Sequence, residues 1–202
     1  MDALLATPSF DRSGGSLCLD FANTWPDRER EESDQLQSVV HVAAFARQAG
    51  LVDEALEEVL ARRVREEPAA ARAALVRARE AREAIFGLCS DSAAGRPARP
   101  GDLRIFNRAL ADALGHLRLE PGEGGFRWGW EGSSLDAPLW PILRSAADLL
   151  ASEDRGRIRE CAGPQCTWLF LDRSRAGTRR WCSMSSCGNR AKARRHYHRK
   201  AV

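Results

Sequence analysis

The chain has 202 residues, of which 44% are hydrophobic and 29% charged, and a formal net charge of +3 at pH 7. This composition is typical of a globular protein and excludes an intrinsically disordered chain. The N-terminal sequence MDALLATPSFDRSGG has neither the cationic start nor the apolar stretch of a signal peptide, and no eighteen consecutive residues are apolar. We therefore expect a cytoplasmic protein with no membrane partner.

The first three quarters of the chain predict a series of amphipathic helices, each preceded by a capping or breaking residue. Apolar residues at helical spacing mark residues 34–50, 53–64, 68–88 and 103–114. A loop over residues 90–102 separates the last two of these segments. Apolar residues from Leu139 to Leu150 predict a further helix, with Pro138 and Pro141 tolerated near its first turn.

A predicted β-hairpin interrupts the helices. Residues 117–131, LRLEPGEGGFRWGWE, place two short runs rich in Leu, Phe and Trp around Pro-Gly-Glu-Gly-Gly. The polar stretch SEDRGR at residues 152–157 then marks the best candidate for a domain boundary. We expect a mainly α N-terminal domain with this small hairpin, an α+β arrangement, over residues 1–156, and a separate C-terminal domain over residues 157–202.

The charge is divided unevenly between these two domains. Residues 157–202 contain twelve Lys or Arg against two acidic residues, Glu160 and Asp172, and so carry +10. Residues 1–156 contain 19 Lys or Arg against 26 Asp or Glu, and so carry −7. Such an asymmetry indicates a polyanionic partner for the basic part, with nucleic acid ahead of an anionic membrane surface.

Four of the six cysteines form a metal-binding pattern. They follow the spacing C-x4-C, fifteen residues, C-x4-C, and are Cys161, Cys166, Cys182 and Cys187. Two such pairs match a tetrahedral tetrathiolate site for one structural Zn2+. Two disulfides are the alternative, which the lack of a signal peptide disfavours. A catalytic zinc is disfavoured because four thiolates leave no open coordination position. Cys18 and Cys89 stand in apolar surroundings and are interpreted as ordinary buried thiols.

The segment between the cysteine pairs predicts how the chain returns to the metal. TWLFLD at residues 167–172 is rich in β-forming residues, RSRAG supplies a turn, and TRRW leads back to Cys182. We expect a treble-clef-like finger, in which a cysteine turn, a β-hairpin and a second cysteine turn are followed by a helix. Residues 157–202 contain few large apolar side chains, so zinc must supply much of the stability. His196 and His198 are not needed as ligands, because four cysteines complete the shell.

The sequence GNRAKARRHYHRK, residues 188–200, predicts a cationic helix that begins near Cys187. It has no apolar stripe that would bury one face, so packing does not explain its composition. A helix of this kind fits the major groove of DNA, and we expect base-edge contacts from Asn189, Arg190 and Arg194. Phosphate contacts are expected from Lys192, Arg195, Arg199 and Lys200 in the helix and from Arg173, Arg175, Arg179 and Arg180 before it.

Other interpretations of the basic segment remain open. A charge run alone is usually a solvated tail, but attachment to a zinc site favours nucleic-acid contact. An RNA-binding module has the same electrostatics and would expose aromatic rings for base stacking, so burial of Trp168, Phe170 and Tyr197 would favour DNA. A protein-interaction finger, whose helix docks on an acidic partner, is a further alternative. An enzyme ranks last, because no nucleophile–base pair or open metal site is recognisable.

The same residues carry a resemblance to a known family. The stretch CAGPQCTWLFLDRSRAGTRRWCSMSSCGNRAKARRHYHR resembles the CGNR zinc fingers, named after Cys187, Gly188, Asn189 and Arg190. Upstream, GGSLCLDFANTW at residues 14–25 resembles the LDF-x-NT opening of the ABATE domain, which usually precedes this finger and is described as a stress-induced transcription regulator. The resemblance implies a bacterial transcription regulator whose finger binds DNA and whose N-terminal domain senses a signal or mediates association.

The polar residues of the upstream motif have two interpretations. Asp20, Asn23 and Thr24 are candidates for binding a small polar effector. Short polar side chains that cap helices or satisfy local backbone groups produce the same letters. The sequence also leaves a homodimer open, since regulators that read palindromes are often dimers.

Overall fold

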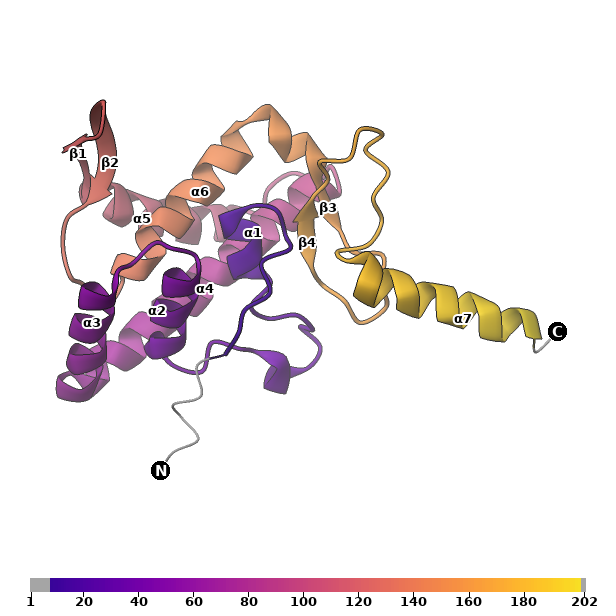
Figure 1. The fold of residues 1–202 in the computed structure, drawn as a ribbon, viewed down its shortest axis with the longest axis horizontal. Coiled ribbons are helices and arrows are strands. Elements are labelled where there is room, and N and C mark those ends of the chain that lie inside the picture. The colour runs from indigo at the N-terminus through magenta and orange to yellow at the C-terminus, as the bar shows by residue number, and fades with distance from the viewer. Residues whose placement is uncertain (1–7, 201–202) are drawn as a thin grey trace.

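The structure is a computed structural model that describes residues 8–200, without the side chains at residues 195, 196 and 198–200. Its helices are α1 (Leu17–Ala22), α2 (Val39–Gln48), α3 (Glu54–Glu66), α4 (Pro68–Ala93), α5 (Pro100–Gly115), α6 (Trp140–Ala151) and α7 (Asn189–Lys200). Its strands are β1 (Leu117–Gly122), β2 (Gly125–Trp130), β3 (Ile158–Glu160) and β4 (Leu169–Leu171). Figure 1 shows α1 to α6 gathered in one body, from which α7 extends away.

Helix α4 runs through the centre of the N-terminal domain. Pro68 opens it at a position where the missing N–H costs no hydrogen bond. Its buried side carries the small residues Ala74, Ala78 and Ala81 and then the larger Ile85. Small side chains allow neighbouring helices to approach closely, and α4 packs against α1, α2 and α5. The helix predicted for residues 68–88 is present, and it continues beyond its expected end to residue 93.

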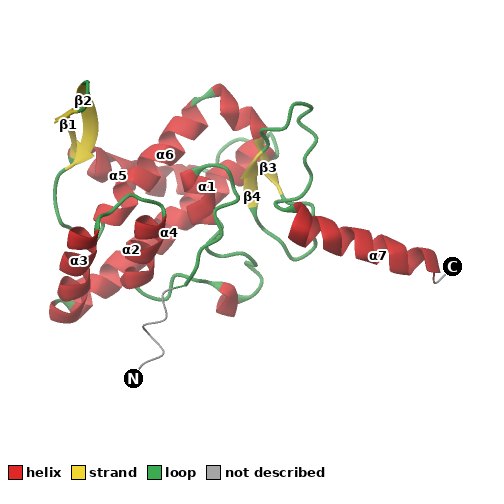
Figure 2. Cartoon of the chain, viewed as in Figure 1, coloured by secondary structure: helices red, strands yellow, loops and turns green. Residues whose placement is uncertain are grey.

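Strands β1 and β2 form the hairpin predicted for residues 117–131. They pair antiparallel, with Leu117 opposite Trp130 and Gly122 opposite Gly125. Gly124 and Gly125 have φ angles of +76° and +150°, which residues with side chains rarely adopt, and this explains the glycines of the turn. The hairpin stands at the end of the helical body opposite to the finger (Figure 2).

The second strand pair differs from the prediction. β4 pairs antiparallel with β3, which precedes the first cysteine, and not with the TRRW segment that follows β4. Leu169 and Leu171 are buried in the core of the N-terminal domain, so β4 lies against that domain beside β3. The returning segment is held outside a strand ladder. The Asp172 carboxylate accepts a hydrogen bond from the Arg179 N–H at 3.0 Å, and the Arg180 carbonyl accepts one from the Ala162 N–H at 2.9 Å. The prediction of a hairpin between the cysteine pairs is therefore wrong, although its first strand exists as β4.

The predicted fold class is confirmed, because a mainly helical chain with a small hairpin is followed by a finger that ends in a helix. Helix α1 is the α-helix of the N-terminal domain that the sequence pattern did not predict. It has only six residues, too few to display a helical period, and five of them are buried. Within residues 8–200, no helix combines the length and the apolar character needed to cross a bilayer.

Candidate metal centre and nucleic-acid interface

The first cysteine pair lies in a turn that begins directly after β3. The Cys161 N–H donates to the Trp168 carbonyl at 2.9 Å, which closes the base of the turn. Gln165 has a φ angle of +59°, and this left-handed backbone reverses the chain between the two cysteines. An added Cβ at Gly163 would lie 3.1 Å from the Cys187 Sγ. Glycine therefore allows the turn to wrap closely around the sulfurs.

The second cysteine pair leads into the cationic helix. The Cys182 N–H donates to the Cys161 Sγ at 3.4 Å, which brings the two pairs together. Cys187 lies in a single wide helical turn, Met184–Gly188. Helix α7 begins at Asn189, directly after this turn. The helix expected near Cys187 is therefore present, and its first turn grows out of the metal-binding segment.

The four cysteine sulfurs converge on one point. Their Sγ atoms all lie within 4.8 Å of one another, with 3.8 Å between Cys166 and Cys182 and 3.6 Å between Cys182 and Cys187. A tetrahedral centre with Zn–S bonds of about 2.3 Å requires sulfurs about 3.8 Å apart. A disulfide requires about 2.05 Å, and these cysteines are free thiols. The geometry fits one tetrahedral metal ion and does not fit two disulfides.

Hydrogen bonds stabilise negative charge on two of the four sulfurs, those of Cys161 and Cys187. Hydrogen bonds from Cys166 and Cys182 lower the pKa of the Cys161 thiol. The Arg190 Nη2 donates to the Cys187 Sγ at 2.9 Å, and this sulfur raises the pKa of Arg190. Four thiolates around one Zn2+ carry an excess of negative charge, which a guanidinium in contact with a sulfur partly neutralises. The sequence pattern did not indicate this role for Arg190.

The other letters of the CGNR motif also support the junction between metal centre and helix. Gly188 packs under Met184, whose sulfur would lie 2.8 Å from an added Cβ. The Asn189 side-chain amide donates to the Ser185 carbonyl at 3.2 Å, one helical turn back. Both contacts hold the start of α7 against the second cysteine turn, and Asn189 nevertheless remains an exposed residue.

The arginines before α7 divide into two groups. Arg179 is half-buried, and its guanidinium donates to the carbonyls of Trp181, at 2.9 Å, and Cys182. It also covers the Phe170 ring at 4.4 Å, so it braces the second cysteine turn. The exposed group consists of Arg173, Arg175 and Arg180.

Helix α7 presents cations beyond the metal centre. Lys192 and Arg194 are exposed. The side chains of Arg195, Arg199 and Lys200, also predicted to contact nucleic acid, lie outside the described residues. With a rise of about 1.5 Å per residue, the twelve residues of α7 form a rod about 18 Å long. Figure 1 shows this rod extending away from the helical body.

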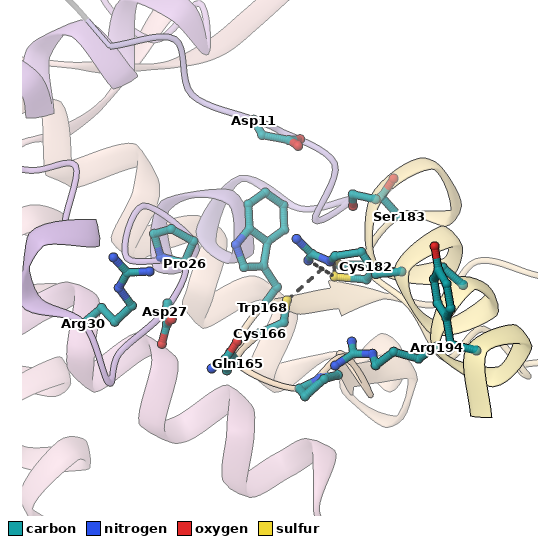
Figure 3. A pocket seen from close by; sticks show the side chains of 16 residues that line it. Asp11, Pro26, Asp27, Arg30, Gln165, Cys166, Trp168, Cys182, Ser183 and Arg194 are labelled. Carbon is teal, nitrogen blue, oxygen red and sulfur yellow. Dashed lines mark hydrogen bonds between the residues drawn. The ribbon is translucent and has the colours of Figure 1, made fainter. Parts of the chain in front are cut away.

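A cleft of about 710 Å3 lies between the start of α7 and the N-terminal domain (Figure 3). Arg190 and Arg194 line it from the helix, and Asp27 and Arg30 line it from the N-terminal domain. Two residues predicted to read base edges therefore share one side of α7, as their spacing of four requires. This side of the helix faces the N-terminal domain.

Sequence comparison identifies both parts of the chain. The sequence model of the ABATE family, described as "Putative stress-induced transcription regulator", matches residues 15–153. The chain belongs to the ABATE family. The model of the CGNR zinc finger matches residues 157–200, and with the four converging sulfurs it supports one structural Zn2+ in the finger. Neither family description names a reaction. No curated protein matches the sequence.

The LDF-x-NT motif of the ABATE domain engages in internal hydrogen bonds. The Asp20 Oδ1 accepts from the Gly14 N–H at 2.7 Å, and the Thr24 Oγ1 donates to a backbone carbonyl of α1 at 2.8 Å. The Asn23 side chain bonds to the backbone of Leu169 in the finger. All three polar residues are buried. Each of the three side chains thus bonds to a backbone group, and this explains why the motif is polar. An effector site at these residues stays a prediction.

Asp20 makes the stability of the ABATE domain depend on pH. Burial raises its pKa from 3.8 to about 6. A carboxyl with a raised folded-state pKa stabilises the fold when protonated, so this contribution is present below about pH 4 and is lost as the pH rises to about 6. Asp20→Asn keeps an oxygen that accepts from Gly14 and removes the charge. We expect the variant to have a higher Tm than the wild type at pH 7 and a similar Tm at pH 4. A Tm difference that is constant across this range would contradict the argument.

Proposed function

We propose that the protein is a DNA-binding transcription regulator in which one structural Zn2+ presents the basic helix α7 to DNA. The proposed zinc ligands are Cys161, Cys166, Cys182 and Cys187. The observation that carries the proposal is the junction at the last of these cysteines, which lies two positions before the first residue of α7. Whatever fixes the metal therefore also fixes the direction of the helix.

The distribution of charge supports a polyanionic partner. The finger carries +10 and residues 1–156 carry −7, so the electrostatic field orients the finger towards DNA and turns the N-terminal domain away. We propose base-edge contacts for Asn189, Arg190 and Arg194. Phosphate contacts are proposed for seven cations of the finger, which are Lys192, Arg195, Arg199, Lys200, Arg173, Arg175 and Arg180. Arg179 is not among them, because its guanidinium bonds to the carbonyls of Trp181 and Cys182. Residues 1–156 would then act as the sensing or association domain and residues 157–202 as the DNA-binding domain of a cytoplasmic regulator.

RNA is the second candidate partner, and the exposure of aromatic rings bears on the choice. Phe170 is fully buried against the cysteines, which favours DNA. Trp168 is half-buried and favours neither partner. Tyr197 on α7 is 72% exposed, as base stacking in an RNA complex requires. The buried Phe170 of β4 therefore favours DNA, whereas the exposed Tyr197 ring of α7 favours RNA.

A binding titration tests the proposal with zinc-loaded protein against duplex DNA and single-stranded RNA of equal length. We expect tighter binding to the duplex. A plot of log K against log salt concentration should have a slope near −5 or steeper, because about six or more phosphate contacts release counterions on binding. Tighter binding to RNA would favour the second candidate. A slope near zero would contradict a polyanionic partner of either kind.

A further inference from the structure

Strand β4 belongs to two cores at once. Successive side chains of a strand point to opposite faces, and Leu169 and Leu171 lie in the main core of the ABATE domain. Phe170, between them, lies in the cluster formed by the cysteines. Three consecutive residues therefore connect the ABATE domain to the metal centre without an intervening linker.

The two edges of β4 also have different hydrogen-bond partners, β3 on one edge and the ABATE domain on the other. On one edge, the Cys161 N–H donates to the Trp168 carbonyl and the Asp172 N–H donates to the Arg157 carbonyl, both at 2.9 Å. These bonds flank the pairing with β3. The backbone groups of residues 169 and 171 point to the opposite edge, which β3 leaves open.

The ABATE domain binds this open edge. The Asn23 side chain donates to the Leu169 carbonyl at 2.8 Å and accepts from the Leu169 N–H at 2.9 Å. The Leu171 N–H donates to the Gly14 carbonyl at 2.7 Å. One side-chain amide and one backbone carbonyl thus take the place of a third strand.

We propose that Asn23 is a positioning residue of the zinc finger, whose amide clamps β4 and so couples zinc binding to the folding of the ABATE domain. Buried backbone groups that lack partners are costly, and Asn23, only 2% exposed, supplies both partners for Leu169. β4 in turn holds the Trp168 carbonyl to which Cys161 bonds. The inference rests on the four-cysteine zinc site and goes beyond DNA binding.

The clamp gives the ABATE domain a direct route to the DNA-binding part. Asn23 is the C-terminal cap of α1, and α1 packs against α4, α6 and β4. A displacement of α1 would therefore move β4 and the first cysteine turn with it. Coupling free energies are reciprocal, so zinc must stabilise the ABATE domain by the same amount as the folded domain strengthens zinc binding.

The variant Asn23→Ala tests the clamp, and Gln48 offers a matched control. The Gln48 side chain makes the same kind of double contact, because it donates to the Pro8 carbonyl at 2.7 Å and accepts from the Phe10 N–H at 3.0 Å. It ties the N-terminal segment to α2 and bonds to no described residue of the finger. Gln48→Ala therefore removes similar hydrogen bonds from the same domain without loosening β4.

Zinc affinity is measured by competition with a chromophoric chelator, and Tm is measured with zinc and with excess chelator. We expect Asn23→Ala to bind zinc about tenfold more weakly than the wild type, because two hydrogen bonds are lost. The rise in Tm that zinc produces should shrink in the same variant. Gln48→Ala should have a lower Tm and an unchanged zinc affinity. A folded Asn23→Ala protein that binds zinc as tightly as the wild type would overturn the proposal.

Hydrogen exchange on the wild type gives a test that does not depend on how the variant folds. Removal of zinc should speed exchange of the amides in α1 and leave those in α3 unchanged, since α3 packs mainly against α2 and α4. Exchange in α1 that is indifferent to zinc would overturn the coupling. A wild type that binds no zinc at all would instead overturn the proposed function.

Discussion

Removal of zinc is expected to abolish DNA binding while the helices of the ABATE domain stay folded at room temperature. Helix α7 has no apolar face, an isolated helix of twelve residues is marginal in water, and its like charges repel. Structural zinc contributes on the order of 10–16 kcal/mol of apparent binding free energy near neutral pH. No other contact of the second cysteine turn approaches this magnitude, so α7 should lose its direction and its helical structure together.

Chelation followed by circular dichroism and a DNA titration measures this effect. The helical signal should fall by a fraction that corresponds to α7, because α1, α4 and α6 are held by the main core. DNA binding should disappear and should return when zinc is added back. Metal-free protein that still binds DNA with a steep salt dependence would show that the basic segment acts as an unstructured tail.

Replacement of one ligand should reproduce the result of chelation. Cys187→Ser is expected to bind no stoichiometric zinc after purification, because three thiolates remain and the start of α7 loses its anchor. Cys89→Ala is the matched control. Cys89 is fully buried in the main core, and burial raises the pKa of its thiol well above the usual value. Elemental analysis should find one zinc per chain in the wild type and in the control.

The metal centre could be predicted because its chemistry is local in the sequence. The spacing of the four cysteines encodes two short turns, and the absence of an apolar stripe in residues 188–200 already separates α7 from the core. Helices α2 to α6 were also predictable, because their apolar period extends over ten or more residues. In each case the information lies within one segment of the chain.

The pairing of β4 could not be predicted, because it depends on a surface built by distant segments. The apolar run of Leu169, Phe170 and Leu171 indicates a strand that is buried on both faces, but the sequence does not say which elements cover them. Asn23 lies 146 positions away from the residue that it binds. The sulfur contact of Arg190 could not be predicted for a related reason, because the sequence does not distinguish an arginine that bonds to a sulfur from one that contacts a base edge, as was expected for Arg190. In both cases the partner decides the role.

Neutralisation of two exposed cations is expected to weaken DNA binding roughly 60-fold at 0.1 M salt. Each phosphate contact contributes about 0.9 to the salt slope, so Lys192→Gln combined with Arg180→Gln should make the slope shallower by about 1.8. At 0.1 M salt, a slope change of this size corresponds to roughly the stated loss of affinity. Both residues are exposed and lie outside the metal-binding turns, so zinc content should not change.

The matched control places the same two charge losses on the ABATE domain. Arg62→Gln with Arg104→Gln alters exposed cations of α3 and α5, and we expect an unchanged slope because that domain is repelled by DNA. If the control weakens binding as much as the Lys192 and Arg180 variant does, DNA must contact the N-terminal domain, and α7 is not the main binding surface.

Arg190→Ala should behave differently from both double variants. The Arg190 guanidinium bonds to the Cys187 Sγ, so zinc affinity should fall about 10- to 100-fold, as for other groups that support metal ligands.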